Sequence, residues 1–387
     1  MRRTAWYSPD RSMKAYLLVV CLGVFAVMAL SNAIVPVLPA FATGAAWEGA
    51  IYAAYFLGAF FSTLPGGILS DRYGRTPIIQ AGLGLTVIGG ALLFCTTGPL
   101  TVIVLRLAEG LGAGFFIAAG MSYINSQPDH TRMSGYYLAM LNFGLVLGLA
   151  ASGWLAVRFM QPALGIGVFT ALSLAALVAS LVFRETTPPP SRPDGGHRKP
   201  AVSHSGKEFQ EVAALVISHG RLWYSAIILV GITGVVASLY PAFSGEPADV
   251  LGFWIAGMSV TTIITVLVIS RFPVPALPAI RWSAVFMIGG VLLAYISPLG
   301  FIVLGILAGI VMVAQMTALA GEQDCQGRVM GLFSTSSYLG MTILPFIAGI
   351  VAAGAGYPDA FLVTAALGGT VALSICGWHS HCPQPAQ

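Results

Sequence analysis

Long apolar runs separated by short polar connections dominate this sequence, and they predict an all-α polytopic membrane protein. Each run holds about 20 residues, the length that an α-helix needs to span the hydrocarbon core of a bilayer. Twelve such runs are present. They lie near residues 15–38, 49–69, 77–97, 99–123, 134–157, 162–183, 223–243, 250–270, 280–297, 299–319, 329–353 and 357–378.

One connection is much longer than the rest and separates the predicted spans into two groups of six. It contains three consecutive prolines at 188–190, a Gly-Gly pair and several basic residues. Proline-rich and glycine-rich polar segments of this kind are typical of linkers. We therefore expect an N-terminal half at 1–184, a cytoplasmic linker at 185–222 and a C-terminal half at 223–387. Apolar positions at helical spacing in 207–217 also predict an amphipathic helix on the membrane surface.

The two halves repeat each other weakly. A shift of 199 residues pairs Pro99 with Pro298, and a shift of 196 residues pairs Gly144 with Gly340. Such internal similarity predicts two six-helix bundles of related topology. Arg72 has a counterpart in Arg271, but the acid of the charged turn and both charges of the fourth span are not repeated, so the charged machinery is complete only in the N-terminal half. The residues that replace Asp71, Arg106 and Glu109 under the first shift are Ser270, Gly305 and Ala308.

Composition and charge support a membrane location. The 387 residues are 57% hydrophobic and 8% charged, whereas soluble domains carry about 25% charged residues. Sixteen of the 18 lysines and arginines fall on one side of the predicted topology. The positive-inside rule then places both termini in the cytoplasm. We expect the protein to lie in the plasma membrane, with the lipid bilayer as its surroundings. The net charge of +4 therefore reflects topology and gives no reason to expect a nucleic-acid partner.

The sequence offers no catalytic chemistry. Its glycine-rich segments lack a phosphate-binding lysine, and its six histidines fall in predicted loops or tails. The five cysteines show no metal-ligand spacing and no disulfide framework; a cysteine in an apolar segment is usually a small hydrophobic residue. We expect no enzyme activity, no cofactor and no metal.

A compact charged turn connects the second and third predicted spans in a chain that is otherwise poor in charge. It resembles the loop between helices 2 and 3 of the major facilitator superfamily, whose pattern is Gly-x-x-x-Asp-Arg-x-Gly-Arg-Arg. The last basic position of that pattern is Thr76 here. The matching residues are Gly67, Asp71, Arg72, Gly74 and Arg75.

This resemblance covers nearly the whole chain and implies the fold of that superfamily, with twelve transmembrane helices in two six-helix pseudo-repeats. It implies a secondary transporter that works by alternating access, with a small-molecule site between the halves near the bilayer midplane. It also implies that the charged turn latches the halves on the cytoplasmic side by contact with the end of the eleventh helix. We expect a monomer.

Arg106 and Glu109 lie deep inside the fourth predicted span. Their i, i+3 spacing puts them on one face of the helix, and a charge within a membrane must face the protein interior. The segment resembles the superfamily's helix 4 motif, Arg-x-x-Gln-Gly-x-Gly-Ala-Ala, with a titratable glutamate in place of its glutamine. The resemblance implies proton exchange at this pair. A purely structural ion pair, or a helix boundary that lies elsewhere, is the alternative.

The fifth predicted span partly resembles the antiporter motif Gly-x-x-x-Gly-Pro-x-x-Gly-Gly of drug-exporting branches. The matching residues are Gly144, Gly148 and Gly153, while Leu149 replaces the proline. Small residues at such spacing also serve simple helix packing. The Pro-Val-Leu-Pro segment at 36–39 likewise resembles the drug/proton antiporter branch. Together they favour a proton-coupled exporter over a facilitator or importer of a small nutrient, or a non-transporting receptor or scaffold.

The resemblance implies that helices 1, 4, 7 and 10 line the cavity, with contributions from their neighbours. An apolar cavity without further acids favours lipophilic or weakly polar substrates. Each polar candidate could instead simply bond a neighbouring helix. The candidates are Asn32, Tyr55, Asn142, Tyr240, Trp254, Gln315 and Tyr338.

Overall fold

The structure is a computed structural model that describes residues 11–96, 98–127, 129–182, 216–319 and 326–376. Within these ranges the chain is entirely helical, and twelve helices are long and apolar enough to span a membrane, as the hydropathy pattern predicts. Most of the amphipathic helix expected at 207–217 falls outside the described residues.

The first six helices are α1 (Arg11–Ala33), α2 (Ala45–Tyr73), α3 (Arg75–Phe94), α4 (Pro99–Asn125), α5 (His130–Phe159) and α6 (Leu164–Val182). The second six are α8 (Gly220–Ser244), α9 (Ala248–Ile269), α10 (Ala276–Ile296), α11 (Leu299–Leu319), α12 (Gln326–Ala355) and α13 (Tyr357–Cys376). Most bounds lie within four residues of the apolar runs.

The first apolar run is not one continuous helix. Helix α1 ends at Ala33, and a 3-10 helix, η1 (Val35–Ala40), follows it. Pro36 has no N–H to donate to the carbonyl of Asn32, so an α-helix cannot continue through this position without losing a bond. The end of α1 therefore lies inside the bundle, and its last carbonyl groups are available to other partners.

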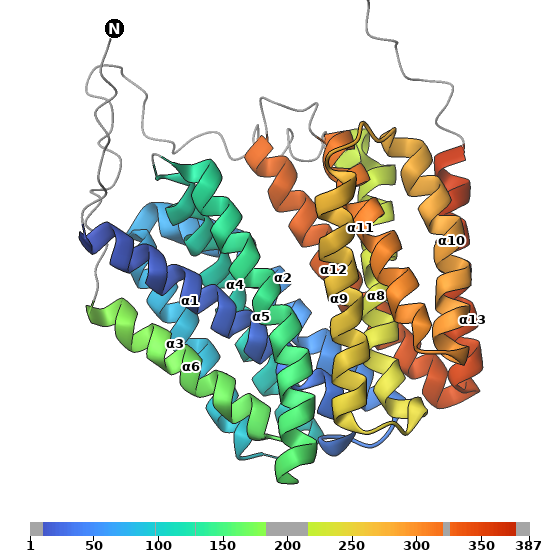
Figure 1. Cartoon of the computed structure of the whole chain (residues 1–387), viewed down its shortest axis with the longest axis horizontal. Coiled ribbons are helices and arrows are strands. Elements are labelled where there is room, and N and C mark those ends of the chain that lie inside the picture. The colour runs from blue at the N-terminus through green and yellow to red at the C-terminus, as the bar shows by residue number, and fades with distance from the viewer. Residues whose placement is uncertain (1–10, 97, 128, 183–215, 320–325, 377–387) are drawn as a thin grey trace, which may run out of the picture.

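Helices α1–α6 and α8–α13 form two groups that lie side by side (Figure 1). We call the end of the bundle that holds the α2–α3 turn the Arg72 end, and the opposite end, where α2 begins, the Glu48 end. The ribbons of the two groups converge toward the Glu48 end and diverge toward the Arg72 end.

Two seams join the groups, and both lie toward the Glu48 end. In one, α2 meets α12: a Cβ on Gly49 would lie 2.5 Å from the carbonyl oxygen of Pro345. In the other, α5 meets α9: a Cβ on Gly252 would lie 2.5 Å from the carbonyl oxygen of Leu149. Backbones this close leave no room for a side chain, so the molecule is firmly closed at this end.

The seams follow the internal repeat. Gly144 of α5 packs against the backbone of α1, and its counterpart Gly340 of α12 packs against the backbone of α8. Gly153 of α5 contacts α9, and its counterpart Gly349 of α12 contacts α2. Residues paired by the 196-residue shift thus make equivalent contacts in the two groups.

Candidate functional site

Glycines bring α4 directly against α2 and thereby bury the charged pair. Gly110 of α4 faces the carbonyl oxygen of Tyr55, and Gly58 of α2 faces the carbonyl oxygen of Leu107. Helix α3 closes on the other side, where a Cβ on Gly89 would lie 3.3 Å from the Cβ of Glu109. Small residues at these contacts allow the backbones to approach closely, as is usual between membrane helices.

Arg106 and Glu109 form an ion pair within α4. The Nη1 atom of Arg106 donates to Oε2 of Glu109 at 2.7 Å, and the residues are only 1% and 0% exposed. Among the described residues, these two and Glu48 are the only buried members of the four charged residue types. The predicted i, i+3 pairing is therefore present in the structure.

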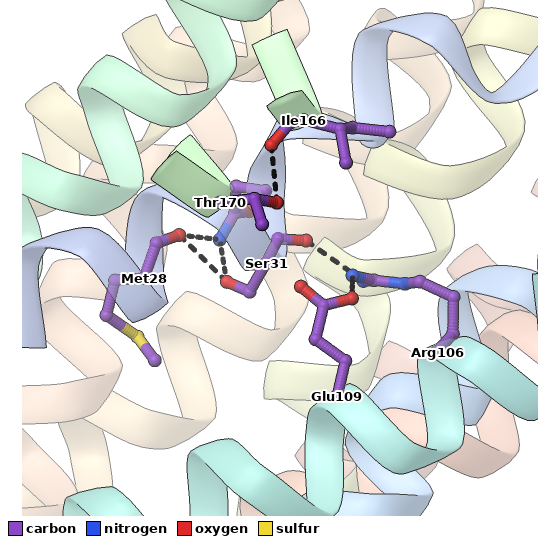
Figure 2. Close-up of polar contacts among 7 residues, drawn as sticks. Met28, Ser31, Arg106, Glu109, Ile166 and Thr170 are labelled. Atoms are coloured by element: carbon purple, nitrogen blue, oxygen red, sulfur yellow. Dashed lines mark hydrogen bonds and ion pairs between the residues drawn. The ribbon is translucent and has the colours of Figure 1, made fainter. Parts of the chain in front are cut away.

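Arg106 has two further partners from neighbouring helices. Its Nη2 atom donates to the carbonyl oxygen of Ser31 at 2.9 Å, in the last turn of α1 (Figure 2). Its Cζ atom lies 4.5 Å from the centre of the Tyr55 ring of α2. A cation at the carboxyl end of a helix and over an aromatic face is stabilised at both positions. Arg106 thus ties α1, α2 and α4 together.

The polar network around Ser31 continues along α1. Asn32 donates from Nδ2 to Oγ of Ser31 at 2.9 Å and to the carbonyl oxygen of Met28 at 3.3 Å. The Ser31 hydroxyl itself donates to the carbonyl oxygen of Met28 at 2.8 Å. The side chain of Asn32, predicted to contact substrate, is therefore engaged within its own helix in this state.

The network is incompletely satisfied. Oε1 of Glu109, Nε of Arg106 and the hydroxyl of Tyr55 are buried and have no hydrogen-bond partner in the structure. Buried polar atoms without partners are rare in proteins and call for an explanation. A proton can add to Oε1 without displacing any hydrogen bond, because the bond from Arg106 goes to Oε2.

A chain of aromatic rings leads from the charged pair to the second group of helices. The Tyr55 ring lies 5.2 Å from that of Phe56, which lies 6.3 Å from the ring of Tyr338 in α12. The Tyr52 hydroxyl also reaches Sδ of Met341 in α12 at 3.8 Å. Two predicted cavity residues, Tyr55 and Tyr338, are thus brought together at the centre of the molecule.

The remaining predicted cavity residues contact other partners. Asn142 donates to the carbonyl oxygen of Leu138 within α5 at 2.8 Å. Gln315 is buried and donates to Oγ of Ser225 at 2.9 Å. Tyr240 packs edge-on against Phe301 with ring centres 4.8 Å apart, and Trp254 packs against the apolar core.

The glycines of α5 face backbones rather than open space. Gly144 and Gly148 meet the carbonyl oxygens of Phe25 and Ala29 in α1, while Gly153 meets that of Ala248 in α9. Their immediate role is therefore close packing, both within the first group and across one of the seams.

The charged turn lies at the Arg72 end, and its acid is exposed. Within the described ranges, Asp71 makes no hydrogen bond or ion pair. Arg75 donates from Nε to Ser122 at 3.2 Å and from Nη1 to Ser126 at 2.7 Å. Gly74 adopts a φ of 93°, which the sharp turn between α2 and α3 requires and which other residues disfavour.

One buried charge lies outside the predicted spans. The apolar pattern predicts the second span at 49–69, but α2 begins at Ala45, so Glu48 lies in its first turn and is 2% exposed. The signal was a lone acid directly before an apolar run with no basic residue near it in the sequence. Across the described residues, no group of histidine, cysteine, aspartate and glutamate could hold a metal ion.

Comparison with known proteins gives a family match. Residues 20–322 match the family model of the Major Facilitator Superfamily.

Two curated relatives carry names that refer to drug resistance. Multidrug resistance protein 2 of Bacillus subtilis (strain 168) is 23% identical over 366 residues, which cover 87% of this chain and 89% of that protein. The multi-drug resistance efflux pump PmrA of Streptococcus pneumoniae serotype 4 is 34% identical over 128 residues, which cover 32% of this chain and 31% of that protein.

Solved structures share the fold at low sequence identity. A bacterial homologue of the human lysosomal transporter Spinster, in an inward-facing and unoccupied conformation, aligns with a TM-score of 0.74 at 14% identity. That alignment covers 94% of this chain and 95% of the other. The nucleoside transporter NupG aligns with a TM-score of 0.71 at 12% identity over 96% of this chain and 100% of its own.

Proposed function

Because the chain belongs to the major facilitator superfamily, we propose that this transporter is a proton-coupled exporter of small lipophilic compounds. The observation that carries the proposal is the buried Arg106–Glu109 pair. Charge buried within a membrane span is costly and usually marks a functional site. The fold and the relatives support a transporter and give no support to an enzyme or a scaffold.

The distribution of basic residues supports the orientation that we propose. Most described lysines and arginines lie toward the Arg72 end, while Arg158 alone lies toward the Glu48 end. By the positive-inside rule, the Arg72 end faces the cytoplasm, and both termini lie on the cytoplasmic side. We propose that the protein is a monomer in the plasma membrane. Because the seams are at the Glu48 end, the molecule is then inward-facing and ready to receive substrate from the cytoplasm.

The coupling step that we infer takes place at Oε1 of Glu109. When a proton binds there, the carboxylate loses its charge, and Arg106 keeps the Ser31 carbonyl and the Tyr55 ring as partners. The electrostatic attraction that holds the guanidinium beside Glu109 is then weaker. A shift of Arg106 moves Tyr55, and the contacts of Tyr55 with Phe56 and of Phe56 with Tyr338 carry that movement to α12.

The aromatic centre favours lipophilic cations among the possible substrates. The rings of Tyr52, Tyr55, Phe56 and Tyr338 offer faces that attract cations and bury apolar surface. A bound cation and a proton on Glu109 would each reduce the same negative charge, so each disfavours the other. That competition is the basis of exchange. The names of the curated relatives, which refer to multidrug resistance and efflux, support export.

Transport by the purified protein in proteoliposomes tests this proposal. With an imposed proton gradient, we expect ethidium to move against the direction of proton flow, and Glu109→Gln to abolish that movement. Glu246→Gln makes the same chemical change at an exposed acid outside the helices and should transport normally. Movement of substrate in the same direction as protons would contradict export and favour import.

A further inference from the structure

We propose that Glu48 is a second proton-binding site, separate from the Arg106–Glu109 pair. Glu48 holds a proton when the Glu48 end is closed and releases it when that end opens. The inference uses the alternating access that the family implies, but it requires neither the coupling role of Glu109 nor any particular substrate. Its ligand is a proton from the medium at the Glu48 end.

Glu48 is buried directly beside a seam. Its neighbour Gly49 and the residue one turn before it, Ala45, both lie close to the backbone of α12. A Cβ on Gly349 would lie 2.6 Å from the carbonyl oxygen of Ala45. The buried carboxyl group therefore lies beside the contact between the two groups of helices, and separation of α2 from α12 would open its surroundings.

The surroundings of Glu48 are apolar. The 3-10 helix η1, which has no titratable residue, packs against α2 and against α5, α8 and α9. The part of α12 toward the Glu48 end, beyond Pro345, and the first turns of α4 also contain no titratable side chain. The titratable residues of α2 and of the second group near this end are Tyr52 of α2, Tyr240 of α8, Asp249 of α9, Tyr295 of α10, Tyr357 and Asp359 of α13, and Glu246 after α8.

No cation balances the acid among the described residues. Arg158, the described basic residue at this end, is exposed and lies over the ring of Phe159 at 5.9 Å. Oε2 of Glu48 has no hydrogen-bond partner. Glu109, by contrast, has Arg106 at 2.7 Å. A cation therefore balances the charge of Glu109, whereas no described cation balances that of Glu48.

These observations favour the protonated acid in the closed state. The backbone N–H of Gly44 is a partner for the Glu48 carboxylate, but a buried carboxylate that no cation balances is still strongly disfavoured and neutralises instead. The amino end of α2 does favour a negative charge, but that stabilisation is small compared with the cost of desolvation. Once the seam opens and water reaches the carboxyl group, the ionised form is restored and the proton returns to the medium.

Linkage fixes the direction of the effect. The closed state binds one more proton than the open state, so a lower pH stabilises closure of the Glu48 end. One proton changes the ratio of closed to open molecules by at most about tenfold per pH unit. If this end faces outward, an acidic exterior returns the transporter to its inward-facing state after release of substrate.

Spin-label distances across the Glu48 end test the proposal. Labels on Gln161→Cys, after α5, and Ile296→Cys, at the end of α10, occupy exposed positions on the two groups. The background replaces the five native cysteines with alanine. The short-distance population is the fraction of molecules in which the two labels lie close together because the Glu48 end is closed. We expect this population to rise as the pH is lowered from 8 to 5. In Glu48→Gln it should be high at every pH, whereas Glu48→Asp should keep a pH response.

Two controls separate the proposals. Asp359→Asn changes an exposed acid at the same end and should behave like the wild type. Glu109→Gln removes the other buried acid and should retain the response that depends on Glu48, even if it abolishes transport. An equal pH response in the wild type and Glu48→Gln, or no response in the wild type, would overturn the inference.

Discussion

Arg106 distributes its charge over a carboxylate, a backbone carbonyl and an aromatic ring, whereas Glu109 depends on Arg106 alone among the described residues. The pair is therefore asymmetric. Without Glu109, the guanidinium still has two partners. Without Arg106, a buried carboxylate is left with none, which is the more costly of the two losses.

We expect Arg106→Met to lower the free energy of unfolding by about 3 kcal/mol, because removal of one partner of a buried ion pair leaves an uncompensated charge. The double variant Arg106→Met with Glu109→Leu should recover most of that stability, while transport remains lost in both. Thermal unfolding in detergent, read beside transport, checks this. A double variant no more stable than the single one would show that the pair does not act as a unit.

The sequence was sufficient to predict this pair, because the spacing of two charges on one helix determines which side chains can meet. It could not reveal the Ser31 carbonyl as a partner, since that depends on where α1 ends inside the bundle. Glu48 lies outside the predicted span for a similar reason: the helix begins before its apolar run, and burial of its first turn depends on how α2 packs in the bundle.

At the scale of elements, glycines determine which helices touch. The twelve spans follow from apolar run length alone, and the structure bears them out. Which helices are neighbours does not follow from run length, because a glycine in a membrane helix marks a close approach without identifying the partner helix. Gly148 faces Ala29 of α1, while Gly84 of α3 has nothing near the position of its missing Cβ.

This contrast gives a matched pair of substitutions. A methyl group at Gly148 would collide with the backbone of α1, so we expect Gly148→Ala to destabilise the protein by roughly 1–3 kcal/mol. Gly84→Ala should be neutral or slightly stabilising, because alanine is the better helix former. Unfolding midpoints of the two variants in the same detergent decide the matter. Equal midpoints would mean that α1 and α5 do not pack this closely.

At the scale of the whole molecule, the two groups of helices are joined at the Glu48 end, and the charged turn at the opposite end is exposed. This is the arrangement expected if the turn acts as a latch that is released here and engages α12 only when the molecule reverses. The resemblance to the superfamily suggested that role, but the sequence could not tell which state the chain would adopt.

We therefore expect Asp71→Asn to shift the molecule further toward the state described here, because it weakens the latch that holds the alternative state. The label pair at Gln161 and Ile296 should report a larger short-distance population than in the wild type. Asp129→Asn, at an exposed acid outside the turn, serves as the control. An unchanged population and transport rate would remove Asp71 from the latch.

The most direct measurement is proton release by the purified protein on addition of ethidium, with Glu109→Gln compared with the wild type. Competition between substrate and proton predicts release from the wild type on binding, and none from Glu109→Gln. Glu246→Gln should release protons as the wild type does. Equal release from the wild type and Glu109→Gln would contradict the central claim and leave the Arg106–Glu109 pair with a structural role.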